Sequence, residues 1–171
     1  MNTLEAISKS SSHREYQDTP LNEDQIKVLL EAGLCAPSSE NEQPWYLIGI
    51  LDKEVVRQID HDIQSIHGDQ KAHFFNAPAA ILVAVNQSAT TPVVDAATCT
   101  QNILLAAEDL NLASCWVDGI LAINKSDKFE LYKQKYHLPD GYEFQTSIAL
   151  GHRVSTTTSK GPRKGQYIII K

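Results

Sequence analysis

The sequence lacks the segments that would place a protein in or across a membrane. It has no apolar run of bilayer-spanning length, and its opening residues, MNTLEAISKSSSHREY, contain no long apolar stretch of the kind found in secretory signals. Cysteine is also scarce: Cys35, Cys99 and Cys115 lie apart in apolar surroundings, and none belongs to a Cys-x-x-Cys pair. Such a set predicts reduced thiols in a cytoplasmic protein with no membrane partner.

Motifs for metal, dinucleotide and nucleic-acid binding are absent as well. The histidines show no HExxH-type spacing and no GxGxxG fingerprint occurs, so we expect no metal site. The net charge of −6 argues against nucleic acid as the main partner. Glycine (8) and proline (7) are neither enriched nor depleted, so disorder is not indicated.

What the chain does contain is enough apolar material for one core. Its 171 residues are 42% hydrophobic, which predicts a single globular domain spanning residues 1–171. The charge is unevenly placed, because the segment 144–171 has no acidic residue and carries Arg153, Lys160, Arg163, Lys164 and Lys171. This basic tail is either a solvated segment or a segment that binds a compact anion.

The hydrophobic pattern predicts helices and strands in mixed order. We expect helices at 3–10, from the cap at Asn22 to just before Pro37, and at 53–66, 91–110 and 126–136. We expect strands at 45–51, 77–85, 113–117, 144–151 and 166–170. Because the middle strands are apolar throughout, the prediction is an α+β fold with a central mixed sheet wrapped by helices.

Two segments do not fit an isolated domain. The apolar strand at 166–170, QYIII, follows a polar stretch and needs a sheet edge to pair with, for which a partner subunit is one candidate. The loop in APSSENEQPWYLIGI (36–50) places Ser38, Ser39, Asn41 and Gln43 between two prolines. A loop that only connects two elements does not need so many hydrogen-bonding groups, so we expect this loop to contact a ligand.

Five segments of the sequence occur in an order that is known from other proteins. SSSHREY, APSSENEQPW and NAPAAILVAV are followed by DAATCTQNILLAAEDLNLASCWVDG and SIALGHR. In this order they resemble the FMN-dependent nitroreductase family, over nearly the whole chain from about Leu4 to Arg163. The resemblance implies an α+β homodimer with two FMN sites at the subunit interface and a C-terminal segment that reaches across the partner. It also implies hydride transfer from NADH or NADPH through flavin N5 to a nitroaromatic, a quinone or a similar small-molecule acceptor.

The resemblance assigns the flavin phosphate and ribityl chain to two segments. The family pattern R-R-S-x-R corresponds here to residues 10–14, which implies contacts from Ser10, Ser11, Ser12 and Arg14. Two basic positions have become serine, and a neutral hydrogen bond to phosphate is weaker than a charged one. Lys160 and Arg163, with Lys164 as a substitute, are the tail residues that fit the phosphate role and offset this loss.

The flavin ring is assigned to three other segments. Pro37, Ser38 and Ser39 match the turn that lies against the ring, Asn41 meets the ring edge or braces its own loop, and Gln43 braces the loop. The backbone of Asp118 and Gly119 matches the positions near N5.

A third segment matches more loosely. Gln70 and His73 align with positions at the pyrimidine edge, where His73 or Arg14 could provide a positive charge near N1. Trp45 and Cys115 are interpreted as packing residues.

The expected chemistry is a two-step (ping-pong) exchange in which FMN carries the hydride and no side chain is assigned as catalytic. The natural acceptor and the choice between NADH and NADPH stay open. Three alternatives also stay open: a non-catalytic flavin-binding protein, a family member that cleaves flavin or dehalogenates its substrate, and a fold relative that no longer binds flavin.

Overall fold

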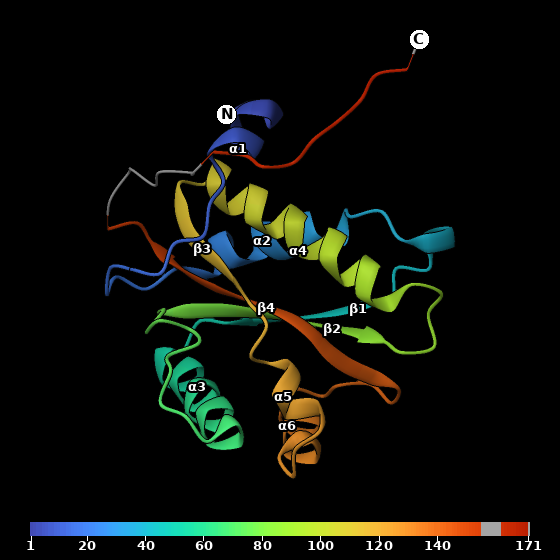
Figure 1. The fold of residues 1–171 in the computed structure, drawn as a ribbon. Coiled ribbons are helices and arrows are strands. Elements are labelled where there is room, and N and C mark those ends of the chain that lie inside the picture. The colour runs from blue at the N-terminus through green and yellow to red at the C-terminus, as the bar shows by residue number, and fades with distance from the viewer. Residues whose placement is uncertain (155–161, 171) are drawn as a thin grey trace.

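The structure, a computed structural model, describes residues 1–154 and 162–170 (Figure 1). Along the chain the elements are α1 (Thr3–Lys9), α2 (Glu23–Leu34), the 3₁₀ turn η1 (Ser39–Asn41), β1 (Trp45–Ile50), α3 (Lys53–His67), β2 (Ala79–Asn86), α4 (Pro92–Asp109), β3 (Leu112–Val117), α5 (Leu121–Asn124), α6 (Phe129–Lys135) and β4 (Tyr142–His152). The α+β fold class is therefore confirmed.

The four strands form one sheet in the order β1-β2-β4-β3. All three neighbouring pairs are antiparallel, so the expected mixed sheet is wrong for these strands. Among the described residues, parallel pairing occurs in a single bridge between Ser12 and Ser114 at the edge of β3. The physical reason is connectivity: the long helix α4 is followed directly by edge strand β3, and β4 then returns between β3 and β2.

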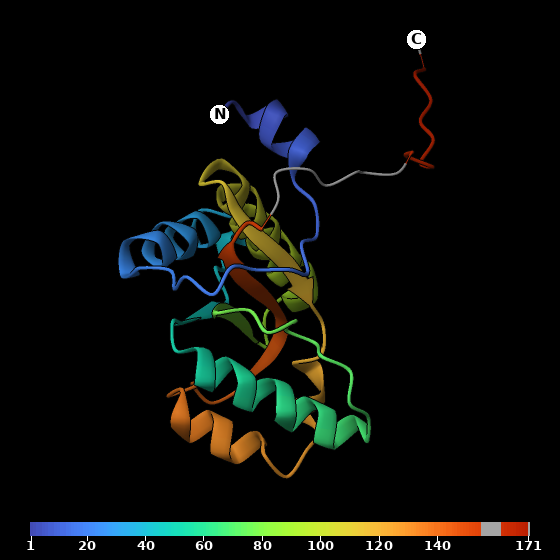
Figure 2. The ribbon, with the colours of Figure 1, turned by 90° about the vertical axis from the view of Figure 1, so that its left-hand side faces the viewer.

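Helices cover both faces of the sheet. α2 and α4 lie on one face, and α3, α5 and α6 lie on the other (Figures 1 and 2). Two apolar clusters result, one containing Ile59, Ile63 and Phe74 and the other containing Leu29 and Ile103. The central strand β2 contributes to both clusters, which explains why its sequence reads as one continuous apolar run.

Local signals account for most helix boundaries. Asn22 caps α2 through a complete capping box with Gln25, and α4 begins at Pro92 directly after Thr91, as predicted. The helix predicted at 126–136 is shorter, because the turn at Ser126 precedes a start at Phe129. The four-residue helix α5 was not predicted from the sequence.

The strand predicted at 166–170 does not form in this chain. Residues 162–170 have no regular structure, and the side chains from Tyr167 to Ile170 are 73–90% exposed. In both views this segment leads away from the sheet (Figures 1 and 2). A strand requires a neighbouring edge to pair with, and residues 166–170 pair with no strand in the described part of the chain.

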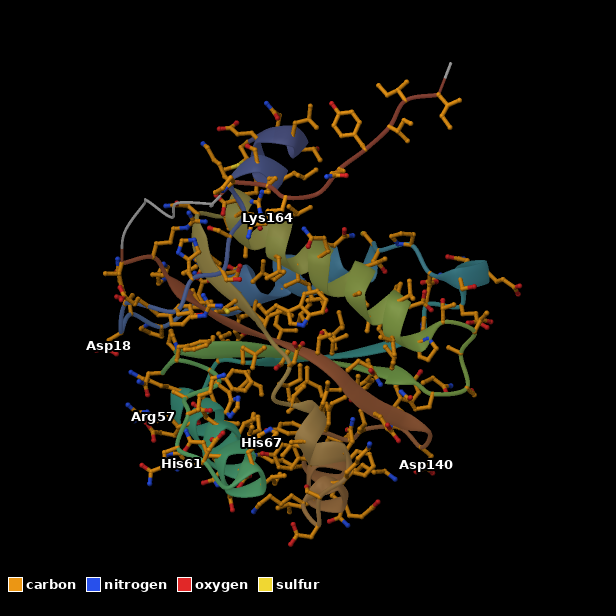
Figure 3. The ribbon with its side chains drawn as sticks, viewed as in Figure 1. Asp18, Arg57, His61, His67, Asp140 and Lys164 are labelled. Carbon is orange, nitrogen blue, oxygen red and sulfur yellow. The ribbon has the colours of Figure 1, made fainter. Side chains whose placement is uncertain are left out.

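Ionisable side chains lie on the outside of the molecule. Arg57 and His61 are exposed on α3, and Asp18 and Asp140 are exposed in loops (Figure 3). Within the described ranges, no helix combines the length and apolarity needed to cross a bilayer. The same ranges contain no group of three or more His, Cys, Asp or Glu side chains that could hold a metal ion.

We predict that Asn124→Ala destabilises the protein by about 1–3 kcal/mol, because it leaves two backbone groups of Phe144 unpaired. The Asn124 amide donates to the Phe144 carbonyl at 2.8 Å and accepts from the Phe144 N–H at 3.1 Å. Urea unfolding measures the change. Gln134→Ala, at an exposed position of α6, is the control, and equal midpoints for both variants would contradict this role of Asn124.

Candidate active site

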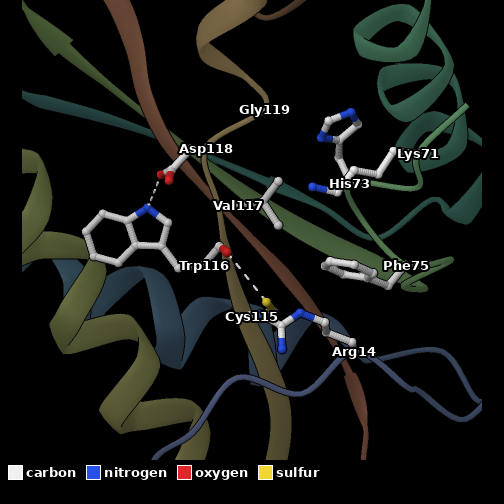
Figure 4. A pocket seen from close by; sticks show the side chains of 9 residues that line it. All are labelled: Arg14, Lys71, His73, Phe75, Cys115, Trp116, Val117, Asp118 and Gly119. Carbon is white, nitrogen blue, oxygen red and sulfur yellow. Dashed lines mark hydrogen bonds between the residues drawn. The ribbon is translucent and has the colours of Figure 1, made fainter. Parts of the chain in front are cut away.

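A pocket of about 210 Å³ opens at the C-terminal end of β3 (Figure 4). Three parts of the chain build it: the segment after α1, the loop between α3 and β2, and the turn from β3 into α5. The residues that line it are Arg14, Lys71, His73, Phe75, Cys115, Trp116, Val117, Asp118 and Gly119. Of the residues predicted for the cofactor, Arg14, Asp118 and Gly119 are therefore brought together here.

The wall formed by residues 116–122 is fixed by short-range hydrogen bonds. The indole N–H of Trp116 donates to the Asp118 carboxylate, and the Asp118 carbonyl accepts from the Leu121 N–H at 3.1 Å. The Gly119 carbonyl likewise accepts from the Ala122 N–H at 3.1 Å. Since the Asp118 side chain is engaged by Trp116, this turn faces the pocket chiefly with its backbone.

Gly119 is required by a contact that the sequence does not reveal. A Cβ atom at this position would lie 2.9 Å from Nδ1 of His73 and 3.2 Å from the Ile63 side chain. The His73 ring also stacks on His67, with ring centroids 5.4 Å apart, and its backbone N–H donates to Asp60 at 2.8 Å. The ring therefore packs against both His67 and the Gly119 backbone.

His73 has one polar atom without a partner among the described residues. Its buried Nε2 makes no hydrogen bond, and the nearest carboxylate oxygen, on Asp69, is 3.8 Å away. A buried polar atom beside a pocket is a place where a ligand group can restore a lost hydrogen bond.

Two cationic side chains give the pocket its charge. The Arg14 guanidinium lies over the Phe75 ring at 5.6 Å, and Lys71 extends into the pocket from the opposite side (Figure 4). Sequence reasoning missed Lys71, although it directly follows Gln70, the residue that was predicted. Gln70 itself is exposed in the loop and does not line the pocket.

Cys115 lies in the pocket wall as a packing residue, as expected. Burial raises the pKa of its thiol, and the Arg14 charge and a hydrogen bond with Ser12 only partly oppose this. The thiol therefore stays protonated near neutral pH, and a protonated thiol is a poor nucleophile.

The serines before Arg14 take different positions. Ser10 ends α1, where its N–H donates to the Ala6 carbonyl at 2.8 Å. Ser12 pairs with Ser114, and the Ser11 hydroxyl lies 3.5 Å from Nε2 of His13. Of the predicted phosphate segment, only Arg14 lines the pocket.

The polar loop between the two prolines lies elsewhere. Pro37, Ser38, Ser39 and Asn41 do not line the pocket, and η1 lies beyond the N-terminal end of α4 (Figure 1). The Gln43 backbone donates to the Ser38 hydroxyl at 2.9 Å, and its side chain donates to Asn41 at 3.1 Å. Gln43 therefore braces the loop, as predicted, and Asn41 takes part in this bracing.

Asp95 anchors this loop to α4, and sequence reasoning missed it. The carboxylate is 2% exposed, and its Oδ1 accepts from the Ser39 N–H and the Thr91 hydroxyl, both at 3.1 Å. One turn later, the Thr98 hydroxyl donates to the Pro37 carbonyl at 2.9 Å. An acidic residue within the apolar run TPVVDAATC was the signal that could have identified it.

Of the tail residues predicted for the phosphate, Arg163 and Lys164 do not line the pocket. Lys160 lies outside the described residues, and Arg163 and Lys164 are exposed on the C-terminal segment (Figure 3 labels Lys164). Within the described residues, the predicted ligand-binding residues of one chain therefore lie at separate places, which include the pocket, the loop between the two prolines and the C-terminal segment.

Chemically, the pocket suits a flat ligand with an electron-rich edge. It offers an aromatic ring, the backbone turn at Asp118 and Gly119, two cations and one unpaired ring nitrogen. This combination is typical of a site for an aromatic anion rather than for an extended polymer.

The comparisons with known proteins agree with this description. A family model described as the Nitroreductase family matches residues 7–152. A protein of Methanothermobacter thermautotrophicus, provisionally named NADH dehydrogenase/NAD(P)H nitroreductase, is 32% identical over 156 residues, which cover 89% of this chain and 78% of that protein. The chain therefore belongs to the Nitroreductase family.

Solved structures show the same fold. A nitroreductase with bound FMN from Desulfitobacterium hafniense is 26% identical and superposes with a TM-score of 0.86 over 98% of this chain and 99% of its own. A nitroreductase with bound FMN from Bacteroides fragilis is 21% identical, and the match covers 100% of both chains with a TM-score of 0.90.

We predict that Gly119→Ala destabilises the protein by about 1–3 kcal/mol, because the new methyl group collides with the His73 ring. Removing the ring in the double variant Gly119→Ala/His73→Ala should recover part of that loss, which a double-mutant cycle in urea measures. Gly165→Ala is the control, because nothing lies within 4 Å of a Cβ at that position. Additive effects of the two substitutions would contradict the contact.

Proposed function

We propose that this protein is an FMN-dependent NAD(P)H oxidoreductase that reduces nitroaromatics, quinones or similar small molecules. The observation that carries the proposal is the pocket at the end of β3, where Arg14 and Lys71 face the Asp118–Gly119 turn. Membership of the Nitroreductase family and the FMN bound to the Desulfitobacterium hafniense nitroreductase support it.

The residues present fit FMN. Phe75 and the Asp118–Gly119 turn suit the faces of a flat ring, and we assign the backbone of Gly119 to the position near N5. Lys71 or Arg14 would stabilise negative charge at the pyrimidine edge, and His73 Nε2 offers a further polar contact. Ser10, Ser11, Ser12 and Arg14 lie on the segment we assign to the ribityl chain and phosphate, and Gln70, exposed in the loop after α3, is assigned to the pyrimidine edge.

The pocket of one chain is smaller than a complete cofactor site. Its volume of about 210 Å³ lies below the roughly 300–1,000 Å³ of typical ligand sites. The loop with Pro37, Ser38, Ser39 and Asn41 is held rigidly at another place on the same chain. We therefore propose a homodimer in which this loop of one subunit completes the pocket of the other.

Exposed apolar side chains on the helical surface support self-association. Val93 and Val94 of α4 are 63% and 59% exposed, and Leu4 and Ile7 of α1 are 78% and 51% exposed. Apolar surface of this kind is a common feature of protein interfaces.

The C-terminal segment is proposed to reach across this homodimer. Residues 167–170 form an exposed apolar run that pairs with no strand among the described residues. The edge of β3 is already paired with the segment at Ser12, whereas β1 is the other edge strand of the sheet. The partner's β1 is therefore the edge we assign to this segment, with Arg163, Lys164 and Lys160 carried toward the phosphate.

FMN, when bound, supplies hydride transfer through its N5 atom. The chain's own residues bind and orient it, hold its edge by positive charge and exclude water from one face. No side chain in the pocket needs to act as an acid or base, because the proton that accompanies the hydride can come from water. Three free cysteines are in keeping with a cytoplasmic setting.

We predict that the protein takes up FMN and that Arg14→Gln and Lys71→Gln each weaken binding by about tenfold, since each removes a charge-assisted contact. Quenching of flavin fluorescence measures the affinity. Lys27→Gln, on the exposed face of α2, is the matched control and should bind like the wild type.

The loaded protein should oxidise NADH or NADPH with a quinone or nitrofuran and give parallel double-reciprocal lines. Binding without turnover would indicate a non-catalytic flavin-binding protein. Failure to take up FMN would leave only the fold in common with the family, and intersecting lines would contradict the two-step exchange.

A further inference from the structure

The segment that carries Ser12 and Arg14 is a strap docked along one end of the sheet. Its backbone pairs with Ser114 through the Ser12 bridge and through the His13 N–H, which donates to the Ser114 carbonyl at 2.9 Å. Further along, the Gln17 N–H donates to the His152 carbonyl at 3.0 Å. We define residues 11–17 as the strap.

His13 is the side chain that the strap buries. It is only 7% exposed, whereas its neighbours Ser12 and Arg14 are exposed, as expected for alternating side chains of an extended segment. The His13 carbonyl accepts from the Tyr16 hydroxyl at 2.7 Å, and its Nε2 lies 3.5 Å from the Ser11 hydroxyl. Both of these contacts lie within the strap, so at His13 the strap is attached to the sheet by the buried side chain and by the N–H that donates to Ser114.

A buried ion pair acts electrostatically on the His13 ring. Arg153, at the end of β4, donates to the Glu108 carboxylate of α4 and to the Leu112 carbonyl at 3.0 Å. Arg153 is 9% exposed and Glu108 5% exposed at the side chain, so both charges are shielded from water. Arg153 and Glu108 are the charged groups that act on His13 from the elements packed against it.

We propose that His13 is a positioning residue whose neutral form keeps the strap docked, so that protonation of its ring releases Arg14 from the pocket and weakens FMN binding. This inference rests on the proposed function. It concerns a residue that does not line the pocket and would act only through the strap.

The direction of the effect follows from the surroundings of the ring. Burial, and then the charge of Arg153, lower the pKa of His13 from its ordinary value of 6.5, and Glu108 opposes this. A released strap therefore takes up a proton more readily than a docked one. The docked state of the strap has its full stability above about pH 6.5. It loses stability as the pH falls from there through the lowered pKa of His13.

The test is the pH dependence of FMN affinity in the wild type and in His13→Gln, which is polar but does not titrate. Because the phosphate of FMN gains a proton near pH 6, the variant supplies the baseline. Below about pH 6.5 the wild-type Kd should rise more steeply than that of the variant, by at most about tenfold per pH unit for one proton. His61→Gln, at an exposed position of α3, should follow the wild type.

A second measurement does not depend on FMN. Hydrogen exchange of residues 11–17 should accelerate between about pH 8 and pH 5.5 more in the wild type than in His13→Gln, after correction for the intrinsic rate. If the glutamine variant is misfolded, His13→Val replaces it as the variant that does not titrate at this position. Superimposed pH profiles of wild type and variant would overturn this inference alone, whereas absence of FMN binding at about pH 8 would overturn the proposed function and this consequence with it.

Discussion

The structure depends on one central strand that is buried on both faces. Every residue of β2 from Ala79 to Val85 is fully buried, and its strand neighbours β1 and β4 pair with it on both sides. A strand of this kind is stable only if apolar helices cover both faces of the sheet. The positions of α2 and α4 on one face and of α3, α5 and α6 on the other follow from this requirement. The pocket then forms where β3 leaves the sheet between these layers, with the loop between α3 and β2 supplying one wall.

The distribution of charge is the second constraint on function. The chain as a whole is acidic, with a net charge of −6, yet its pocket presents Arg14 and Lys71. A local cationic site in an acidic molecule attracts a compact anionic ligand and disfavours long polyanions. The loop anchored by Asp95 supplies neutral hydrogen-bonding groups at another place on the chain. In the proposed dimer, the two halves of the site therefore bring different chemistry to one cofactor.

Much of the fold and part of the site could be predicted from the sequence, for identifiable reasons. The cap at Asn22 and the apolar run of β2 are local signals, and they gave nearly correct boundaries. Arg14, Asp118 and Gly119 were identified through the family's motifs. Lys71, the His73 contact with Gly119 and the anchoring role of Asp95 could not be predicted, because each depends on segments that meet only in the folded chain. The strand predicted at 166–170 was wrong for one chain because strand propensity needs a neighbouring edge.

The central claim is that a complete site contains the pocket of one subunit and the loop of another. Mixing two variants that each fail to bind FMN tests this most directly: Arg14→Glu/Lys71→Glu, which damages the pocket, and Ser39→Glu, which damages the loop. In a co-expressed equal mixture, half of the dimers are mixed, and each mixed dimer regains one intact site. The account therefore predicts about one quarter of the wild-type FMN-binding capacity. No recovery in the mixture, with both variants folded and dimeric, would mean that pocket and loop do not share a cofactor.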